Sequence, residues 1–136
     1  MSGLDRQPIP KSSGVDVLVV DDEPVIVKRL STLLTKLGYT VTACTDSERA
    51  LEILKQKSFS LIITDLKMRK VDGIQILREA RLKDKGIKVI IMTGFGHAES
   101  LSKVISRGLT ELIHKPFKIE ELRNIISNIY LLPGDS

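Results

Sequence analysis

The chain has 136 residues, of which 42% are hydrophobic and 28% charged, and its formal net charge at pH 7 is +4. This length and composition are those of a single globular domain, which excludes fibrous and disordered classes. No apolar run approaches the roughly 18 residues of a membrane helix, and the first residues lack the apolar stretch of a secretory signal, so we expect a cytoplasmic protein.

Composition also argues against nucleic-acid binding and redox chemistry. The 21 Lys and Arg residues are scattered, and the aromatic residues are only two tyrosines and three phenylalanines. Scattered cations are typical of a solvated surface, so we expect no direct nucleic-acid binding by this segment. Cys44 is the single cysteine, which excludes an internal disulfide. It has no Cys or His neighbours at metal-binding spacing and is expected to be buried.

Residues 1–14 contain two prolines and two glycines, show no periodicity and are expected to form a flexible leader. From residue 15 onward, short apolar runs alternate with amphipathic segments. The runs predict strands at 15–20, 39–44, 60–64, 88–93 and 111–114. The amphipathic segments predict helices at 24–38, 47–57, 73–84, 97–108 and 119–132, and residues 133–136 resemble the start of a linker or tail.

Five strands that alternate with five helices indicate an α/β fold with a parallel sheet, right-handed crossovers and helices on both faces. In such a doubly wound sheet, ligands bind outside the carboxyl ends of the strands. Polar residues are therefore expected to gather at those ends.

Polar side chains do follow four of the five predicted strands. Asp21, Asp22 and Glu23 follow the first strand, Asp65 the third, Thr93 ends the fourth, and His114 and Lys115 lie at the end of the fifth. Each could alone be a helix cap, a turn residue or a surface residue. Several carboxylates at one edge repel each other, however, unless positive charge lies among them. Lys115 and a hard cation would supply that charge.

Carboxylate and carbonyl oxygens with water are the ligands that Mg²⁺ prefers, whereas Zn²⁺ is disfavoured because the His and Cys ligands that it prefers are missing. A carboxylate surrounded by Mg²⁺, an ammonium group and a hydroxyl suits phosphoryl transfer. Asp65 is then the expected nucleophile, which would form an aspartyl phosphate.

Four motifs carry a resemblance to a known family: VLVVDDEP, TDLKMRKVDG, IIMTG and HKPF. Their order and spacing resemble the receiver domain of two-component response regulators, over residues 15–132. The resemblance implies a flavodoxin-like sheet with strand order 2-1-3-4-5 and five helices on both faces. It also implies a phosphoprotein that takes part in two-component signal transduction or a phosphorelay.

The resemblance implies a role for each site residue. Asp65 corresponds to the phosphoacceptor, which receives the phosphoryl group from the phosphohistidine of a histidine kinase or histidine phosphotransfer domain. Asp22 corresponds to a direct Mg²⁺ ligand, Asp21 to the acid that orders the metal's waters, and Lys67 to a residue that offers the metal its backbone carbonyl.

Three further positions match the family pattern. Thr93 corresponds to the hydroxyl that turns toward the phosphoryl oxygens, and Lys115 to the ammonium that pairs with them. Pro116 corresponds to the residue of a cis peptide bond.

Three positions depart from the pattern or modify it. Arg69 stands where proline is usual, so the loop gains an N–H and a charge and is expected to be looser. Leu112 replaces the usual Tyr or Phe, so we expect the output signal to travel by movement of the predicted helix at 97–108. Phe95 either shields the phosphoaspartate from water or merely packs on that helix, and His97 and His114 are interpreted as a surface and a strand-end residue.

We therefore predict a phosphorylation switch that acts on a following output domain or an effector protein, and not an enzyme that turns over metabolites. Dimerisation through the fourth helix, fifth strand and fifth helix is compatible with this reading. One alternative is a receiver-like module that acts by contact alone. The other is an aspartyl-nucleophile phosphohydrolase, which is disfavoured because Lys67 stands where such enzymes carry a general acid.

Overall fold

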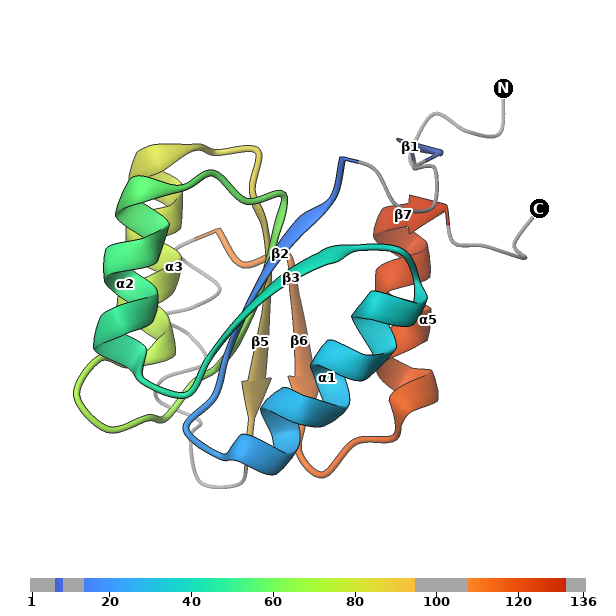
Figure 1. Cartoon of the computed structure of the whole chain (residues 1–136), viewed down its shortest axis with the longest axis horizontal. Coiled ribbons are helices and arrows are strands. Elements are labelled where there is room, and N and C mark those ends of the chain that lie inside the picture. The colour runs from blue at the N-terminus through green and yellow to red at the C-terminus, as the bar shows by residue number, and fades with distance from the viewer. Residues whose placement is uncertain (1–6, 9–13, 95–107, 132–136) are drawn as a thin grey trace.

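The computed structural model describes residues 7–8, 14–94 and 108–131 (Figure 1). Its main feature is a five-stranded parallel sheet in the order β3-β2-β4-β5-β6. The strands are β2 (Asp16–Val20), β3 (Thr40–Cys44), β4 (Leu61–Asp65), β5 (Lys88–Thr93) and β6 (Glu111–His114). Counted along the chain from β2, the order is 2-1-3-4-5, which confirms the predicted sheet.

Helices cover both faces of the sheet. They are α1 (Pro24–Lys36), α2 (Ser47–Gln56), α3 (Gly73–Lys83) and α5 (Ile119–Ile129). In Figure 1, α2 and α3 lie on one side of the sheet, and α1 and α5 on the other. The described residues thus contain four helices where the sequence predicts five, because the predicted helix at 97–108 falls almost entirely within residues 95–107, outside the described part.

The two faces of the sheet enclose separate apolar clusters. Along β2, Val17 and Val19 pack with the α1 and α5 layer, whereas Leu18 and Val20 pack with the α2 and α3 layer. This alternation follows from the period of two in a strand. Because β2 and β4 are buried on both faces, their sequences are continuous apolar runs rather than alternating ones.

The apolar stripes of the helices supply the other half of each cluster. Leu30, Leu34, Leu122 and Ile126 are buried against one face of the sheet, and Ala50, Leu54, Ile76, Leu77 and Ala80 against the other. A fully buried leucine or isoleucine stabilises the fold by about 1.5–3 kcal/mol relative to an exposed one. These two layers hold the strand ends in fixed register.

Side-chain caps fix where two of the helices begin. Asp46 accepts hydrogen bonds from the backbone N–H groups of Glu48 and Arg49 at the start of α2. Asp72 and Gln75 form a reciprocal capping box at the start of α3. The start of α3 directly follows the loop after Asp65, so this cap also fixes the far end of the site loop.

The chain ends differ from the sequence prediction. The last helix, predicted to run to residue 132, ends at Ile129, and Tyr130–Leu131 form a short strand, β7. It pairs in parallel with β1 (Gln7–Pro8), which lies within the predicted flexible leader. Tyr130 adopts an extended backbone because its ring is buried against Tyr39, with ring centroids 6.1 Å apart, and its hydroxyl donates to the Ser60 carbonyl at 3.3 Å.

None of the helices in the described part of the chain has the length and hydrophobicity needed to span a bilayer.

Candidate functional site

The carboxyl ends of four strands bring the predicted site residues to one edge of the sheet. Asp21 directly follows β2, Asp65 is the last residue of β4, Thr93 is the last residue of β5, and Lys115 directly follows β6. These strands are hydrogen-bonded neighbours in the sheet, so residues up to 94 positions apart in the sequence come into contact.

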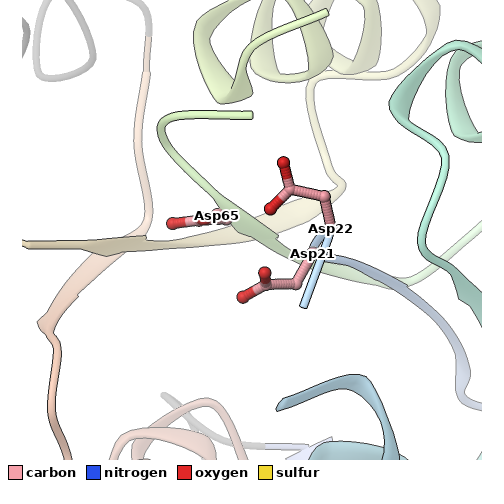
Figure 2. A group of neighbouring side chains, drawn as sticks. All are labelled: Asp21, Asp22 and Asp65. Carbon is pink, nitrogen blue, oxygen red and sulfur yellow. The ribbon is translucent and has the colours of Figure 1, made fainter. Parts of the chain in front are cut away.

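Three carboxylates form the centre of the site (Figure 2). Asp21, Asp22 and Asp65 each offer one oxygen, and these three oxygens lie within 4.8 Å of one another. Asp21 is 0% exposed and Asp65 is 8% exposed, while Asp22 is partly buried. Two buried acids this close repel each other when both are ionised, so the cluster creates a strong local demand for positive charge.

Lys115 supplies part of that charge. Its Nζ lies 2.7 Å from Asp21 Oδ2 and 3.4 Å from Asp65 Oδ2, and it also reaches Glu23 Oε1 at 3.3 Å. The peptide bond between Lys115 and Pro116 is cis, as the resemblance implies. The backbone N–H of Lys115 donates to the Thr93 carbonyl at 2.7 Å, which fixes the residue beside the end of β5.

The electrostatics of the site set the charge state of the acceptor. Burial raises the pKa of Asp65 from 3.8 to about 6, and repulsion by Asp21 adds to this, while Lys115 and the Leu66 N–H oppose it. Burial also raises the pKa of Asp21 despite its hydrogen bond with Lys115. Burial works against the charge on Lys115, but the carboxylates of Asp21 and Asp65 together raise its pKa. The ammonium therefore stays charged at neutral pH, and Asp65 is mostly ionised there.

The backbone around Asp65 is held closely. Its Oδ1 accepts from the Leu66 N–H at 3.0 Å, and the same N–H donates to the Met92 carbonyl at 2.8 Å. The Gly73 N–H donates to the Leu66 carbonyl at 2.8 Å. A Cβ on Gly73 would overlap the carbonyl oxygen of Asp65, so the start of α3 can approach this strand end only with glycine there.

Thr93 is 1% exposed, and its hydroxyl donates to the Gly94 carbonyl at 3.3 Å rather than to a carboxylate. The structure therefore places it at the predicted edge without a direct bond to the acids. Lys67 lies in the loop after Asp65 with an exposed side chain, and the metal-ligand role of its carbonyl stays a prediction.

The site residues fit a hard divalent cation by their donor chemistry. Three carboxylates lie beside one ammonium group, that of Lys115, which contacts Asp21 and Asp65. Every atom that these carboxylates can offer to a metal is an oxygen. Such an excess of buried carboxylate favours binding of a cation with oxygen ligands, which supports the predicted Mg²⁺ site at Asp21, Asp22 and Asp65.

One contact of the site was not predicted. The Arg69 backbone N–H donates to Asp22 Oδ2 at 3.2 Å, and its guanidinium Nε lies 3.9 Å from the same oxygen. The sequence marks Arg69 only as a departure from the family pattern. Its loop, expected to be looser, is bonded at Arg69 and Val71 to the Ser47 hydroxyl.

Other residues singled out in the sequence contribute less. His114 is exposed at the end of β6, and Leu112 is half-buried against the α2 and α3 cluster. Phe95 and His97, with the predicted helix that was expected to carry the output signal, lie outside the described residues.

The chain is a doubly wound α/β domain. At the carboxyl edge of its sheet it carries an acidic cluster that is bridged by Lys115. The family model described as "Response regulator receiver domain" matches residues 17–127. The chain therefore belongs to the response regulator receiver domain family.

The individual similarities agree with this assignment. The chain is 35% identical over 119 residues to the "Two-component response regulator ORR26" of Oryza sativa subsp. japonica, covering 86% of this chain and 20% of that relative. The chain thus spans about a fifth of the length of this relative and of other curated response regulators from Oryza sativa that it matches.

Solved structures show the same likeness. A response regulator receiver domain protein from Clostridium thermocellum superposes with a TM-score of 0.77 at 32% identity, over 85% of this chain and 93% of that one. A receiver domain protein described as CheY-like, from Methanospirillum hungatei JF-1, gives a TM-score of 0.79 at 26% identity, over 85% and 92%.

Proposed function

We propose that the domain is a phosphorylation switch in which Asp65 accepts a phosphoryl group from a phosphohistidine. The observation that carries this proposal is the position of Lys115 Nζ, which lies between the carboxylates of Asp21 and Asp65. An ammonium held there can pair with phosphoryl oxygens as soon as they arrive at Asp65. Membership of the receiver domain family supports the same role.

In this reaction an ionised oxygen of Asp65 attacks phosphorus, an oxygen–phosphorus bond forms, and the nitrogen–phosphorus bond of the phosphohistidine breaks. The electron pair of that bond returns to the imidazole, which takes up a proton. With a pKa of about 6, Asp65 is largely ionised at pH 7 and is ready to attack. Its 8% exposure leaves a narrow approach and limits competing water.

We assign Asp21, Asp22, Asp65 and the backbone carbonyl of Lys67 as the residues that hold Mg²⁺. When bound, Mg²⁺ neutralises charge on the transferring oxygens. The carboxylates of Asp21 and Asp22 provide its binding site and keep it beside the acceptor. Before transfer, Lys115 Nζ lies 2.7 Å from Asp21 Oδ2, which keeps the ammonium in the site.

Phosphorylation then changes the contacts of Thr93 and Lys115. The new group carries a charge near −2 at neutral pH, which attracts hydroxyl and ammonium donors. The Thr93 hydroxyl now bonds to the carbonyl of the next residue, at 3.3 Å, and must turn to reach the phosphoryl oxygens. This rotation would alter the end of β5 and the chain that follows it, and so bias the surface that a partner recognises.

The proposed partners are a histidine kinase or histidine phosphotransfer domain as donor, and an output domain or effector protein as receiver of the signal. The curated relatives are longer than this chain, and their whole-protein activities are not transferred to it. We propose that residues 15–132 form the receiver domain, that residues 133–136 are the start of a linker or a C-terminal tail, and that the domain acts in the cytoplasm. Dimerisation through the predicted helix at 97–108, β6 and α5 is a further proposal.

The decisive experiment is incubation of the purified chain with Mg²⁺ and a small acyl phosphate, followed by intact-mass measurement and a free-phosphate assay. We expect one added phosphoryl group on the parent and none on Asp65→Asn. Continuous release of free phosphate without a lasting adduct would instead support the phosphohydrolase. The absence of any adduct on a folded parent would support the contact-only module.

A further inference from the structure

The site carboxylate Asp22 has a cationic partner of its own. Whereas Lys115 contacts Asp21 and Asp65, the Arg69 guanidinium Nε lies 3.9 Å from Asp22 Oδ2. The same oxygen accepts the Arg69 backbone N–H at 3.2 Å. One residue of the loop between β4 and α3 therefore presents both a neutral donor and a charge to a single site oxygen.

The backbone of Arg69 is fixed by contacts outside the site. The buried Ser47 hydroxyl donates to the Arg69 carbonyl at 2.6 Å and accepts the Val71 N–H at 3.1 Å. The intervening Lys70 has a φ of 71°, and its Nζ lies 3.1 Å from Glu48 Oε1. These contacts tie the loop to the start of α2, so the Arg69 N–H is held toward Asp22.

The side chain of Arg69 is held less firmly than its backbone. It is 88% exposed, and its contact with the Asp22 carboxylate is a long one of 3.9 Å. A guanidinium held this weakly can swing into water at little cost. The backbone N–H therefore orients Asp22 independently of the guanidinium, whose charge can move away from the carboxylate.

We propose that Arg69 is a positioning residue whose guanidinium is a resident counter-cation of Asp22 and weakens the binding of the divalent cation. This inference rests on the proposed function, because it concerns the same cation site. The N–H orients the Asp22 carboxylate at the cation site. The guanidinium balances the acid when no metal is bound and repels the metal when it enters.

The size of the effect follows from the geometry. For a metal bound to Asp22 Oδ2, a Mg²⁺–oxygen distance of about 2.1 Å added to the 3.9 Å from Oδ2 to Nε places the two cations at most about 6 Å apart. In a water-like dielectric, with screening at about 0.1 M salt, repulsion at this distance weakens Mg²⁺ binding by about threefold. In about 1 M salt the Debye length falls to about 3 Å, and the effect should almost vanish.

The test is calorimetric titration of the full chain with Mg²⁺ alone, without a phosphodonor. Arg69→Gln removes the charge but keeps the backbone N–H, and Arg69→Lys keeps the charge. Lys70→Gln is the matched control, because it changes net charge equally at the next residue, whose Nζ pairs with Glu48. Thermal unfolding and circular dichroism check that each variant is folded.

We expect Arg69→Gln to lower the Kd for Mg²⁺ by about threefold at about 0.1 M salt and to match the parent at about 1 M salt. Arg69→Lys should lie close to the parent, and Lys70→Gln should change the Kd by less than about 1.5-fold at either salt concentration. If Arg69→Gln behaves like Lys70→Gln, only net charge matters and the inference is overturned. If the parent binds no Mg²⁺, or Asp22→Asn binds it equally well, the proposed metal site itself fails, and the inference with it.

Discussion

Replacing Asp65 by asparagine should make the metal-free protein more stable at neutral pH. The carboxylate is 8% exposed and lies beside Asp21, and its pKa is raised from 3.8 to about 6. A raised pKa means that the folded state binds the proton more tightly than the unfolded state does. Stability therefore falls as pH rises through the window from 3.8 to about 6, and the full penalty persists above it.

The size of this penalty follows from the pKa shift. A shift from 3.8 to about 6 destabilises the folded state by about 3 kcal/mol at pH 7.5. At pH 4.5 the destabilisation is about 1 kcal/mol, because Asp65 of the folded state is then protonated. Asparagine has the same shape as the protonated acid and no charge. We therefore expect Asp65→Asn to raise the free energy of unfolding by about these amounts.

Urea unfolding of the parent and Asp65→Asn at both pH values, with a metal chelator present, measures this difference. Glu52→Gln is the matched control, because it also removes one negative charge but at an exposed position of α2, where only a small difference in stability is expected. A stability gap for Asp65→Asn that is no larger at pH 7.5 than at pH 4.5 would refute the reasoning. Added Mg²⁺ should reduce the difference in stability between Asp65→Asn and the parent, because it balances the negative charge of ionised Asp65 in the parent.

Two further predictions concern the neighbours of Asp65. Lys115→Met should raise the pKa of Asp65 above 6, because the ammonium lowers it, and should slow phosphorylation about 100-fold through the loss of a charged donor. NMR titration of the Asp65 carboxyl and intact-mass kinetics measure these effects, and an unchanged pKa would contradict the first. Gly73→Ala should lower the free energy of unfolding by about 1–3 kcal/mol, because its Cβ overlaps the Asp65 carbonyl, and urea unfolding measures this loss. Gly86→Ala, whose Cβ would meet only the side chain of Asp84, should differ from the parent by less than about 0.5 kcal/mol, and an equal loss in both variants would contradict the steric explanation.

The sheet and most of the site could be predicted because each depends on a short-range signal. The central strands are buried on both faces, so the sequences of β4 and its neighbours are nearly continuous apolar runs. In a parallel sheet all strands end at the same edge, so the polar residues that follow them must meet. Asp21, Asp65 and Lys115 come together for this reason alone.

The features that were missed depend on contacts that no local pattern encodes. The apolar pattern of the sequence continues with Tyr130, Leu131 and Leu132, so the sequence pattern alone extends the helix beyond Ile129. The extended backbone there goes with the burial of the Tyr130 ring against Tyr39, 91 positions earlier in the chain, and with the pairing of β7 with β1. The contact between Arg69 and Asp22 likewise joins residues 47 positions apart, and only the folded loop reveals it.

The pairing of β1 with β7 fixes the end of the described chain far from the candidate site. Helix α5 runs antiparallel to the strands, so β7 lies at the amino-terminal edge of the sheet, away from Asp65 (Figure 1). Strand β4 alone, at about 3.3 Å per residue, spans about 17 Å between these edges. Any module joined beyond residue 131 would be attached at the edge of the sheet opposite Asp65. The attachment point alone therefore does not place such a module beside the candidate site.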